Sequence, residues 1–201
     1  MAITKQVLAD SLALVAVAAR LHEQALNAAD AKLGDGDTGG MLARVVGRMA
    51  EEDLHASTDI GSALVTLGRA ATAATGSSLG TLLATALLSI GRATKGQEAI
   101  EVSALADLLA AARDAMIARG GASLGDKTVL DSLDAIIAAL KSDSANPAVT
   151  AAAATQQALD DFQDKPNRVG RARMFGDSSI GIDDPGMLAF ALLTKAIVTK
   201  D

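Results

Sequence analysis

Residues 70–91 read AATAATGSSLGTLLATALLSIG, the longest run without a charged side chain, and they lie between Arg69 and Arg92. The run is long enough to cross a bilayer, but Gly76-Ser77-Ser78, Gly80 and four Thr interrupt its apolar surface. Two buried helices that meet at a Gly-Ser turn explain the composition better, because small polar residues mark turns between helices. The run therefore predicts two packed helices and no membrane span.

The same helical character extends over the whole chain. Ala and Leu dominate, and no stretch alternates between apolar and polar residues as a half-buried strand does. Eight helices are expected, over residues 3–28, 38–50, 57–74, 78–93, 102–118, 127–141, 147–162 and 185–198. Most turns between them are short, so neighbouring helices should pack antiparallel. The sequence predicts an all-α fold in a single domain over residues 1–201.

Composition excludes several classes of function. The 201 residues carry a net charge of −6 and contain no Cys, no Trp, no Tyr and three Phe. Disulfides and thiolate metal sites are therefore impossible, and a nucleic-acid partner is not expected from an acidic chain with so few aromatic rings. His22 and His55 are the only histidines, which makes a His-based triad implausible. No signal peptide is evident at the N-terminus, and we expect a cytoplasmic protein.

Three carboxylates follow one another closely after the first expected helix. Asp30 lies at its C-terminal end, where the helix dipole is already negative, and Asp35 and Asp37 follow in the turn LGDGDTG at residues 33–39. Such a cluster repels itself unless a cation binds, and oxygen ligands suit hard ions such as Mg²⁺. The alternative is a glycine-rich turn in which Asp37 or Thr38 caps the next helix, which accounts for one acid and not for three.

The turn Gly76-Ser77-Ser78 opens the helix expected over residues 78–93. Free N–H groups and hydroxyls at a helix N-terminus form a phosphate-binding site. Ordinary N-capping by Ser explains the same residues equally well. Both interpretations stay open for Ser77 and Ser78.

Two later loops carry basic residues. Residues 119–128, RGGASLGDKT, resemble a P-loop, but Asp126 stands before the Lys and a helix precedes the loop, so a true P-loop is not predicted. Residues 165–186 contain three arginines, among them Arg171. Guanidinium groups suit phosphate oxygens, and the alternative is a solvated charged loop. A loop of this length is usually functional or disordered.

The four loops together resemble the nucleotide-binding L subunit, or DAK2-type domain, of dihydroxyacetone kinases. The matching segments are Asp30-x4-Asp35-Gly-Asp37-Thr-Gly39, Gly76-Ser-Ser78, Arg119-Gly120 through Gly125-Asp-Lys-Thr128, and Gly170-Arg-Ala172 through Phe175-Gly176, Ser179-x-Gly181 and Asp184-Pro-Gly186. Each motif is modest alone, but their order and spacing fit over essentially the whole chain.

The resemblance implies a barrel of eight antiparallel helices with a nucleotide, ADP or ATP, at one open end. It implies two Mg²⁺ ions held by Asp30, Asp35 and Asp37. The residues that it places at the nucleotide are Thr38, Met41, Ser77, Ser78, Gly120, Val129, Arg171, Asp184, Pro185 and Gly186. No catalytic side chain is implied, because phosphoryl transfer depends on positioning and charge neutralisation.

The resemblance also implies a partner. In this family a separate K subunit or domain holds the sugar through a covalent link to a His. Some members exchange ADP for ATP, and others keep ADP as a coenzyme that a phosphotransferase-system protein rephosphorylates. The sequence leaves both modes open.

The chain departs from the family pattern at a few positions. Thr38 stands where some members have His, Met41 where some have Asn, and Leu79-Gly80 where the phosphate turn often has Gly-Pro. The metal ligands are unaffected, but the acceptor is left open: dihydroxyacetone, a tetrulose, a longer sugar or a fatty acid. A non-catalytic nucleotide sensor that binds a transcription regulator is the alternative from a different class.

Overall fold

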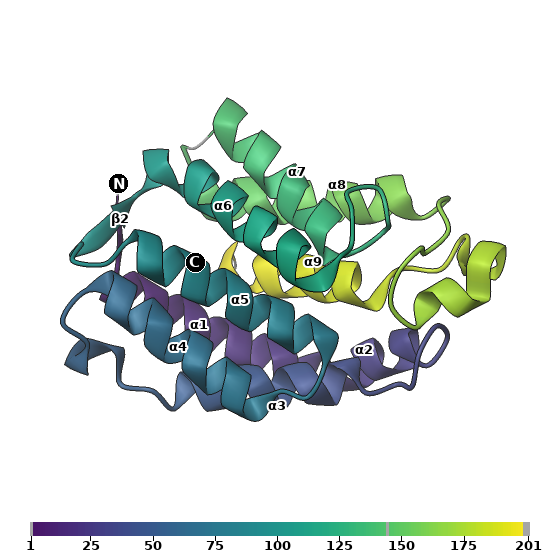
Figure 1. Ribbon diagram of the computed structural model, residues 1–201, viewed down its shortest axis with the longest axis horizontal. Coiled ribbons are helices and arrows are strands. Elements are labelled where there is room, and N and C mark those ends of the chain that lie inside the picture. Colours follow the sequence, from purple (N-terminus) through teal and green to yellow (C-terminus); the bar gives the residue numbers. More distant parts are fainter. Residues whose placement is uncertain (1, 144, 199–201) are drawn as a thin grey trace.

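The computed structural model describes residues 2–143 and 145–198, and most of these residues are helical (Figure 1). The α-helices are α1 (Lys5–Leu21), α2 (Glu23–Asp30), α3 (Thr38–Ala50), α4 (Ile60–Ala74), α5 (Ser78–Ala93), α6 (Val102–Gly120), α7 (Val129–Ser142), α8 (Pro147–Phe162) and α9 (Pro185–Val198). Two 3-10 helices, η1 (Leu54–Ala56) and η2 (Ala172–Ser179), and two short strands, β1 (Ala2–Thr4) and β2 (Ala99–Glu101), complete the described elements. The prediction of an all-helical chain is confirmed apart from this strand pair.

Polar caps set several helix boundaries. The Ser77 hydroxyl accepts from the Gly80 N–H at the start of α5. Thr128 and Asp131 form a reciprocal capping box at the start of α7, and Asn146 caps α8, whose first residue is Pro147. The capping side chains accept from N–H groups that the first turn of a helix leaves without a partner. Proline fits the first position because it has no N–H group. Four predicted helices, over 38–50, 78–93, 147–162 and 185–198, have the observed bounds.

The first predicted helix, over residues 3–28, is wrong in two ways. Its start belongs to β1, which pairs antiparallel with β2 in the register Ile3↔Ile100. Its middle is interrupted at His22, whose φ of −96° and ψ of 4° separate α1 from α2. The strands were not predicted because each has only three residues, which is too few to show an alternation of apolar and polar residues.

The helices form a closed circuit of neighbours. Contacts join α1 to α3, α3 to α4, and so on in chain order through α9, which returns to α1. In Figure 1, α9 runs between an upper group of α6, α7 and α8 and a lower group that includes α1 and α3. The turn after α2 and the η2 segment lie together at the right-hand end of this view. The ends of several helices therefore converge on one end of the molecule.

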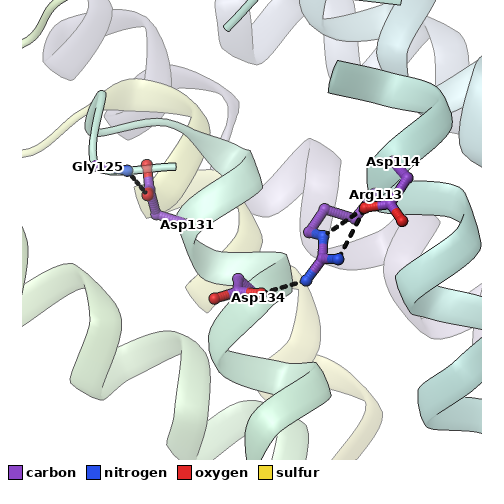
Figure 2. Close-up of polar contacts among 5 residues, drawn as sticks. All are labelled: Arg113, Asp114, Gly125, Asp131 and Asp134. Carbon is purple, nitrogen blue, oxygen red and sulfur yellow. Dashed lines mark hydrogen bonds and ion pairs between the residues drawn. The ribbon is translucent and has the colours of Figure 1, made fainter. Parts of the chain in front are cut away.

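Close packing and ion pairs hold neighbouring helices together. Gly61 of α4 faces Gly91 of α5, and a Cβ added to Gly61 would lie 2.6 Å from the Gly91 carbonyl oxygen. Arg113 of α6 pairs with Asp134 of α7 as well as with its own neighbour Asp114 (Figure 2). The glycines allow two backbones to approach to a distance that a larger residue would prevent.

Apolar side chains fill the space between the helices. Leu26, Val45 and Leu67 are at most 1% exposed and belong to the largest core cluster. An apolar cavity of about 290 Å³ lies among α1, α3, α5, α6, α7 and α9. Within the described residues, no helix has both the length and the apolar character needed to cross a membrane.

Candidate nucleotide and metal site

Three carboxylates come together at the end of α2 and in the turn that follows it. One oxygen each from Asp30, Asp35 and Asp37 lie within 4.8 Å of one another. Asp30 is buried, while Asp35 and Asp37 are exposed. An all-oxygen set of this size fits a hard divalent cation such as Mg²⁺. The predicted grouping of these three residues is therefore present in the structure.

Asp30 has a structural role that the other two acids lack. Its Oδ2 accepts from the N–H of Asp37 at 2.9 Å and from the N–H of Thr38 at 3.2 Å. Asp37 is the N-cap residue of α3 by position, but its side chain makes no capping hydrogen bond. Asp30 therefore binds the N–H groups at the start of α3, in place of the capping by Asp37 or Thr38 that the alternative interpretation expected. The side chains of Asp35 and Asp37 do not cap the helix.

Asn27 binds the backbone after this turn and was not identified from the sequence. The Asn27 Oδ1 accepts from the N–H groups of Gly39 at 2.7 Å and Gly40 at 3.1 Å. A Cβ on Gly39 would lie 2.0 Å from the carbonyl oxygen of Glu23, so only glycine fits there. Asn27 lies three residues before Asp30 on the same helix, and that spacing is the signal that could have found it.

Arg171 reaches the acidic cluster from the far end of the chain. Its guanidinium forms an ion pair with Asp35. The hydrogen bond from Arg171 lowers the pKa of Asp35, and burial opposes that shift only in part. The pKa of Arg171 rises in turn because of the same bond. Arg171 therefore supplies positive charge to a cluster that would otherwise repel itself.

A cavity of about 490 Å³ connects these groups, within the usual range of about 300–1,000 Å³ for small-molecule sites. All but one of the sequence-predicted site residues line it, namely Asp30, Asp35, Asp37, Thr38, Met41, Ser77, Ser78, Val129, Arg171, Asp184, Pro185 and Gly186. The cavity draws its walls from the α2–α3 turn, the start of α5, the start of α7, the η2 segment and the start of α9.

The lining of the cavity differs from the expected set of residues at two positions. Gly120 does not line it: this residue ends α6, and a Cβ there would lie 3.1 Å from Leu82, which does line the cavity. Arg44, which was not predicted, is part of the wall, and its Nε donates to the Ala74 carbonyl. Arg44 lies one helical turn after Met41, so helical spacing could have indicated it.

The Gly-Ser turn combines capping with free donors. The Ser77 Oγ accepts from the Gly80 N–H as the N-cap of α5, which agrees with the N-capping interpretation. The N–H groups of Ser78 and Leu79 lie in the first turn of α5, where a helix offers them no internal acceptor. Ser78 and Leu79 both line the cavity, so this helix N-terminus lies at the wall that the acidic cluster also lines. Such an N-terminus favours anions.

Asp184 forms the cavity wall at the start of α9. Its Oδ1 accepts from the Met187 N–H at 3.0 Å, and its Oδ2 accepts from the Asn167 Nδ2 at 2.8 Å. Burial raises the pKa of this carboxyl to about 6, against the opposing effect of these hydrogen bonds. Both oxygens are thus engaged within the protein, so Asp184 organises the wall as well as lining it.

The loop that resembles a P-loop is held by the protein itself. The buried Asp131 accepts from the Gly125 N–H at 2.6 Å, as Figure 2 shows, and from the Thr128 N–H at 2.8 Å. Thr128 and Val129 line the cavity, but Lys127 does not. The loop therefore contributes a wall and does not cradle phosphate in the manner of a P-loop.

Three other hollows are larger than this cavity. One of about 570 Å³ is lined by Asp35 and Arg171 and so adjoins the same site. The other two are chemically different. They measure about 770 and 870 Å³ and lie along α4, α5 and α6. Neither is lined by a carboxylate among the described residues. Among these hollows, the 490 Å³ cavity alone is lined by all three carboxylates and by the start of α5.

The family model for the DAK2 domain matches residues 32–199. The chain belongs to the DAK2 domain family. It is 35% identical over 184 residues to the L-erythrulose 1-kinase of Mycolicibacterium smegmatis, a match that covers 88% of this chain and 32% of that kinase. It is 29% identical over 181 residues to the ADP-binding subunit DhaL of the PEP-dependent dihydroxyacetone kinase 1 of Listeria innocua, with 90% of this chain and 88% of that subunit covered.

The chain also resembles a solved structure. The dihydroxyacetone kinase of C. freundii in complex with AMP-PNP and Mg²⁺ superposes with a TM-score of 0.76 at 27% identity, over 100% of this chain and 35% of that one. The chain thus spans about a third of two of these relatives and most of the third. All three are named as kinases or kinase subunits.

Proposed function

We propose that this DAK2 domain is the ADP- or ATP-binding phosphotransfer subunit of a kinase for short ketoses, folded as one domain over residues 1–201. The observation that carries the proposal is the cavity itself. Three carboxylates, a helix N-terminus with Ser78, and Arg171 face it from loops that are distant in sequence. Relatives named as an ADP-binding subunit and as an erythrulose kinase support the nucleotide and the ketose.

The polar residues of the cavity would bind magnesium and the phosphates of the nucleotide. Asp30, Asp35 and Asp37 would hold Mg²⁺, with two ions as our specific proposal. Magnesium bound there would neutralise phosphate oxygens and favour phosphoryl transfer as a Lewis acid. The Ser78 hydroxyl, the first-turn N–H groups of α5 and the Arg171 guanidinium would orient the phosphates. No covalent chemistry is needed from the protein in this type of reaction.

The apolar part of the cavity suits the nucleoside. Val129, Pro185 and Gly186 contribute apolar atoms to its lining. A Cβ on Gly186 would lie 3.1 Å from the Asp184 carboxylate, so a larger residue would narrow the wall. We therefore assign the ribose and base to the side formed by α7 and α9, and the phosphates to the side formed by the α2–α3 turn.

The closed circuit of helices supports a barrel of eight, in which α1 and α2 together count as one helix. The phosphates would lie at the end where the α2–α3 turn and η2 meet (Figure 1). A separate K-type subunit that holds the ketose would dock at that end. The phosphoryl source is ATP or a phosphotransferase-system protein, and the rate at which bound ADP leaves separates the two modes.

Calorimetry and reconstitution test this proposal. We expect ADP to bind in the presence of MgCl2 and to bind far more weakly with EDTA. Adding a K-type subunit, ATP and either dihydroxyacetone or erythrulose should then yield ketose phosphate. Magnesium-dependent binding without turnover for either ketose would favour the nucleotide sensor, and the absence of nucleotide binding would contradict the proposal altogether.

A further inference from the structure

The segment between α8 and α9, residues 163–184, carries Arg171 to the acidic cluster but has little regular structure of its own. Its single helical element, η2, is kinked at Gly176, where φ is 50° and ψ is −129°. Long irregular segments of this kind are costly to order unless other groups bind their backbone. Something outside the segment must therefore fix its conformation.

Lys127 binds this segment at three points. Its Nζ donates to the carbonyl oxygens of Lys165 at 2.8 Å, Gln163 at 3.2 Å and Ser179 at 3.3 Å. The side chain is only 1% exposed. An ammonium group has three protons and no acceptor, so three carbonyls use all of its donors. A neutral amine would direct a lone pair at one of these carbonyls.

The backbone of Lys127 is also unusual. Its φ of 62° makes it the one non-glycine residue with a positive φ among residues 2–143 and 145–198. This conformation costs energy for a residue with a Cβ and persists only where the surroundings enforce it. Burial lowers the pKa of the ammonium, and the nearby charges of Asp184 and Asp183 oppose that shift. The positive φ and the burial of the ammonium are both unfavourable, so the contacts of Lys127 must compensate for them.

Asn167 extends the same contacts to the cavity wall. Its backbone N–H donates to the Ser179 Oγ at 2.8 Å. Its Nδ2 donates to the Lys127 carbonyl at 3.2 Å and to the Asp184 Oδ2 at 2.8 Å. The Arg168 N–H donates to the Asp126 carbonyl at 3.2 Å. The turn before α7 therefore binds both ends of the segment that includes Arg171.

We propose that Lys127 is a positioning residue, which holds residues 163–184 in the conformation that places Arg171 in the cavity. The inference rests on the proposed function for its effect on nucleotide binding, although the structural effect is independent of any ligand. Lys127 is too buried to reach a phosphate and does not line the cavity. It acts through the segment that it binds and ultimately through Arg171.

The first test needs no nucleotide. Lys127→Met keeps the aliphatic length but removes all three donors, and Lys141→Met, an exposed position at the far end of α7, is the matched control. We expect hydrogen exchange in residues 163–184 to accelerate by about tenfold or more in Lys127→Met, with α3 to α5 unchanged. Exchange like that of Lys141→Met would overturn the proposal whether or not the protein binds nucleotide.

The second test separates positioning from a general loss of stability. Lys127→Met and Arg171→Ala should each weaken Mg-ADP binding by about tenfold, and the double variant should be little weaker than either, because the first change already displaces Arg171. Effects that multiply in the double variant would contradict the positioning role. If wild type binds no nucleotide, the proposed function fails while the exchange result still decides the structural claim.

Asn167→Ala provides a second test if the Lys127 variant does not fold. If circular dichroism shows that Lys127→Met does not fold, Asn167→Ala removes the Nδ2 contacts to the Lys127 carbonyl and to Asp184 instead. The same faster exchange in residues 163–184 and the same non-additivity with Arg171→Ala are expected. Unchanged exchange in a folded Asn167→Ala variant would overturn the proposal.

Discussion

The three carboxylates of the acidic turn differ in what each contributes at the level of single residues. Asp30 is buried and accepts two backbone N–H groups, so it builds the turn. Asp35 and Asp37 are exposed, and Asp35 is paired with Arg171. Stability and cation binding should therefore separate between these positions.

We expect Asp35→Asn and Asp37→Asn to lower Mg-dependent ADP affinity by about tenfold or more without loss of helix, because each would remove one of the proposed charged ligands. Asp30→Ala should in addition lower the free energy of unfolding by about 1 kcal/mol, since the Asp37 and Thr38 N–H groups lose their acceptor. Calorimetry and urea unfolding measure the two effects, with the exposed Asp107→Asn as control. Wild-type ADP affinity in both Asn variants would refute the metal assignment.

Asp184 gives a prediction about pH. Burial raises its pKa from 3.8 in the unfolded chain to about 6 in the folded protein. The folded state therefore holds the proton more tightly, so the stability that this group contributes is fully present below pH 3.8 and is lost as pH rises toward 6. Relative to Asp184→Asn, the wild-type protein should lose on the order of 2 kcal/mol over this window.

Urea unfolding of wild type and Asp184→Asn at several pH values measures this difference, in which the other titrating groups cancel. The constant offset between the two proteins reflects the hydrogen bonds to Met187 and Asn167. Only the change of the offset with pH reports the titration. A difference that stays constant with pH would show that Asp184 titrates alike in both states.

At the level of elements, the sequence specified helices well where it specified their caps. Ser77 caps α5 as the N-capping interpretation of the Gly-Ser turn predicted, and Thr128 and Asn146 cap α7 and α8 in the structure. The break at His22 and the three-residue strands were not predictable, because no glycine, proline or alternation marks them. Tertiary packing accounts for the strand pair, because Ile3 and Ile100 share a small cluster with Ile60 of α4.

Two glycines within helices should respond in opposite ways to the same substitution. Gly61→Ala adds a Cβ that would lie 2.6 Å from the Gly91 carbonyl, so α4 and α5 must separate, at a cost of about 1–3 kcal/mol in the free energy of unfolding. Gly47→Ala in α3 meets no atom within 4 Å and should stabilise the protein by about 0.5–1 kcal/mol. Urea unfolding compares them, and a fully stable Gly61→Ala variant would disprove the close crossing of α4 and α5.

At the level of the whole molecule, the sequence alone identified the acidic turn and the Gly-Ser turn as separate candidates. Nothing in composition or spacing showed that Arg171 would meet Asp35, because that contact depends on the path of an irregular segment. The family resemblance supplied that grouping. It also placed Gly120 at the site, whereas Gly120 packs against Leu82 and stays outside the lining.

The buried Lys127 was hidden for a similar reason. In sequence it belongs to a loop that resembles a P-loop but is not predicted to be one, and nothing in that pattern gives Lys127 a role. Its positive φ and its three carbonyl partners become visible only in the folded chain. Long-range contacts of this kind decide how the irregular part of the site is built.

Native mass spectrometry of the purified protein tests the central claim most directly. We expect the protein, either as isolated or after addition of ADP and MgCl2, to gain the mass of one ADP with two Mg²⁺, and Asp35→Asn to lose that gain. ADP and magnesium already present in the isolated protein would favour the coenzyme mode, and binding only after addition would favour exchange with ATP. A wild-type protein that stays at its nucleotide-free mass when Mg-ADP and Mg-ATP are supplied would contradict the account.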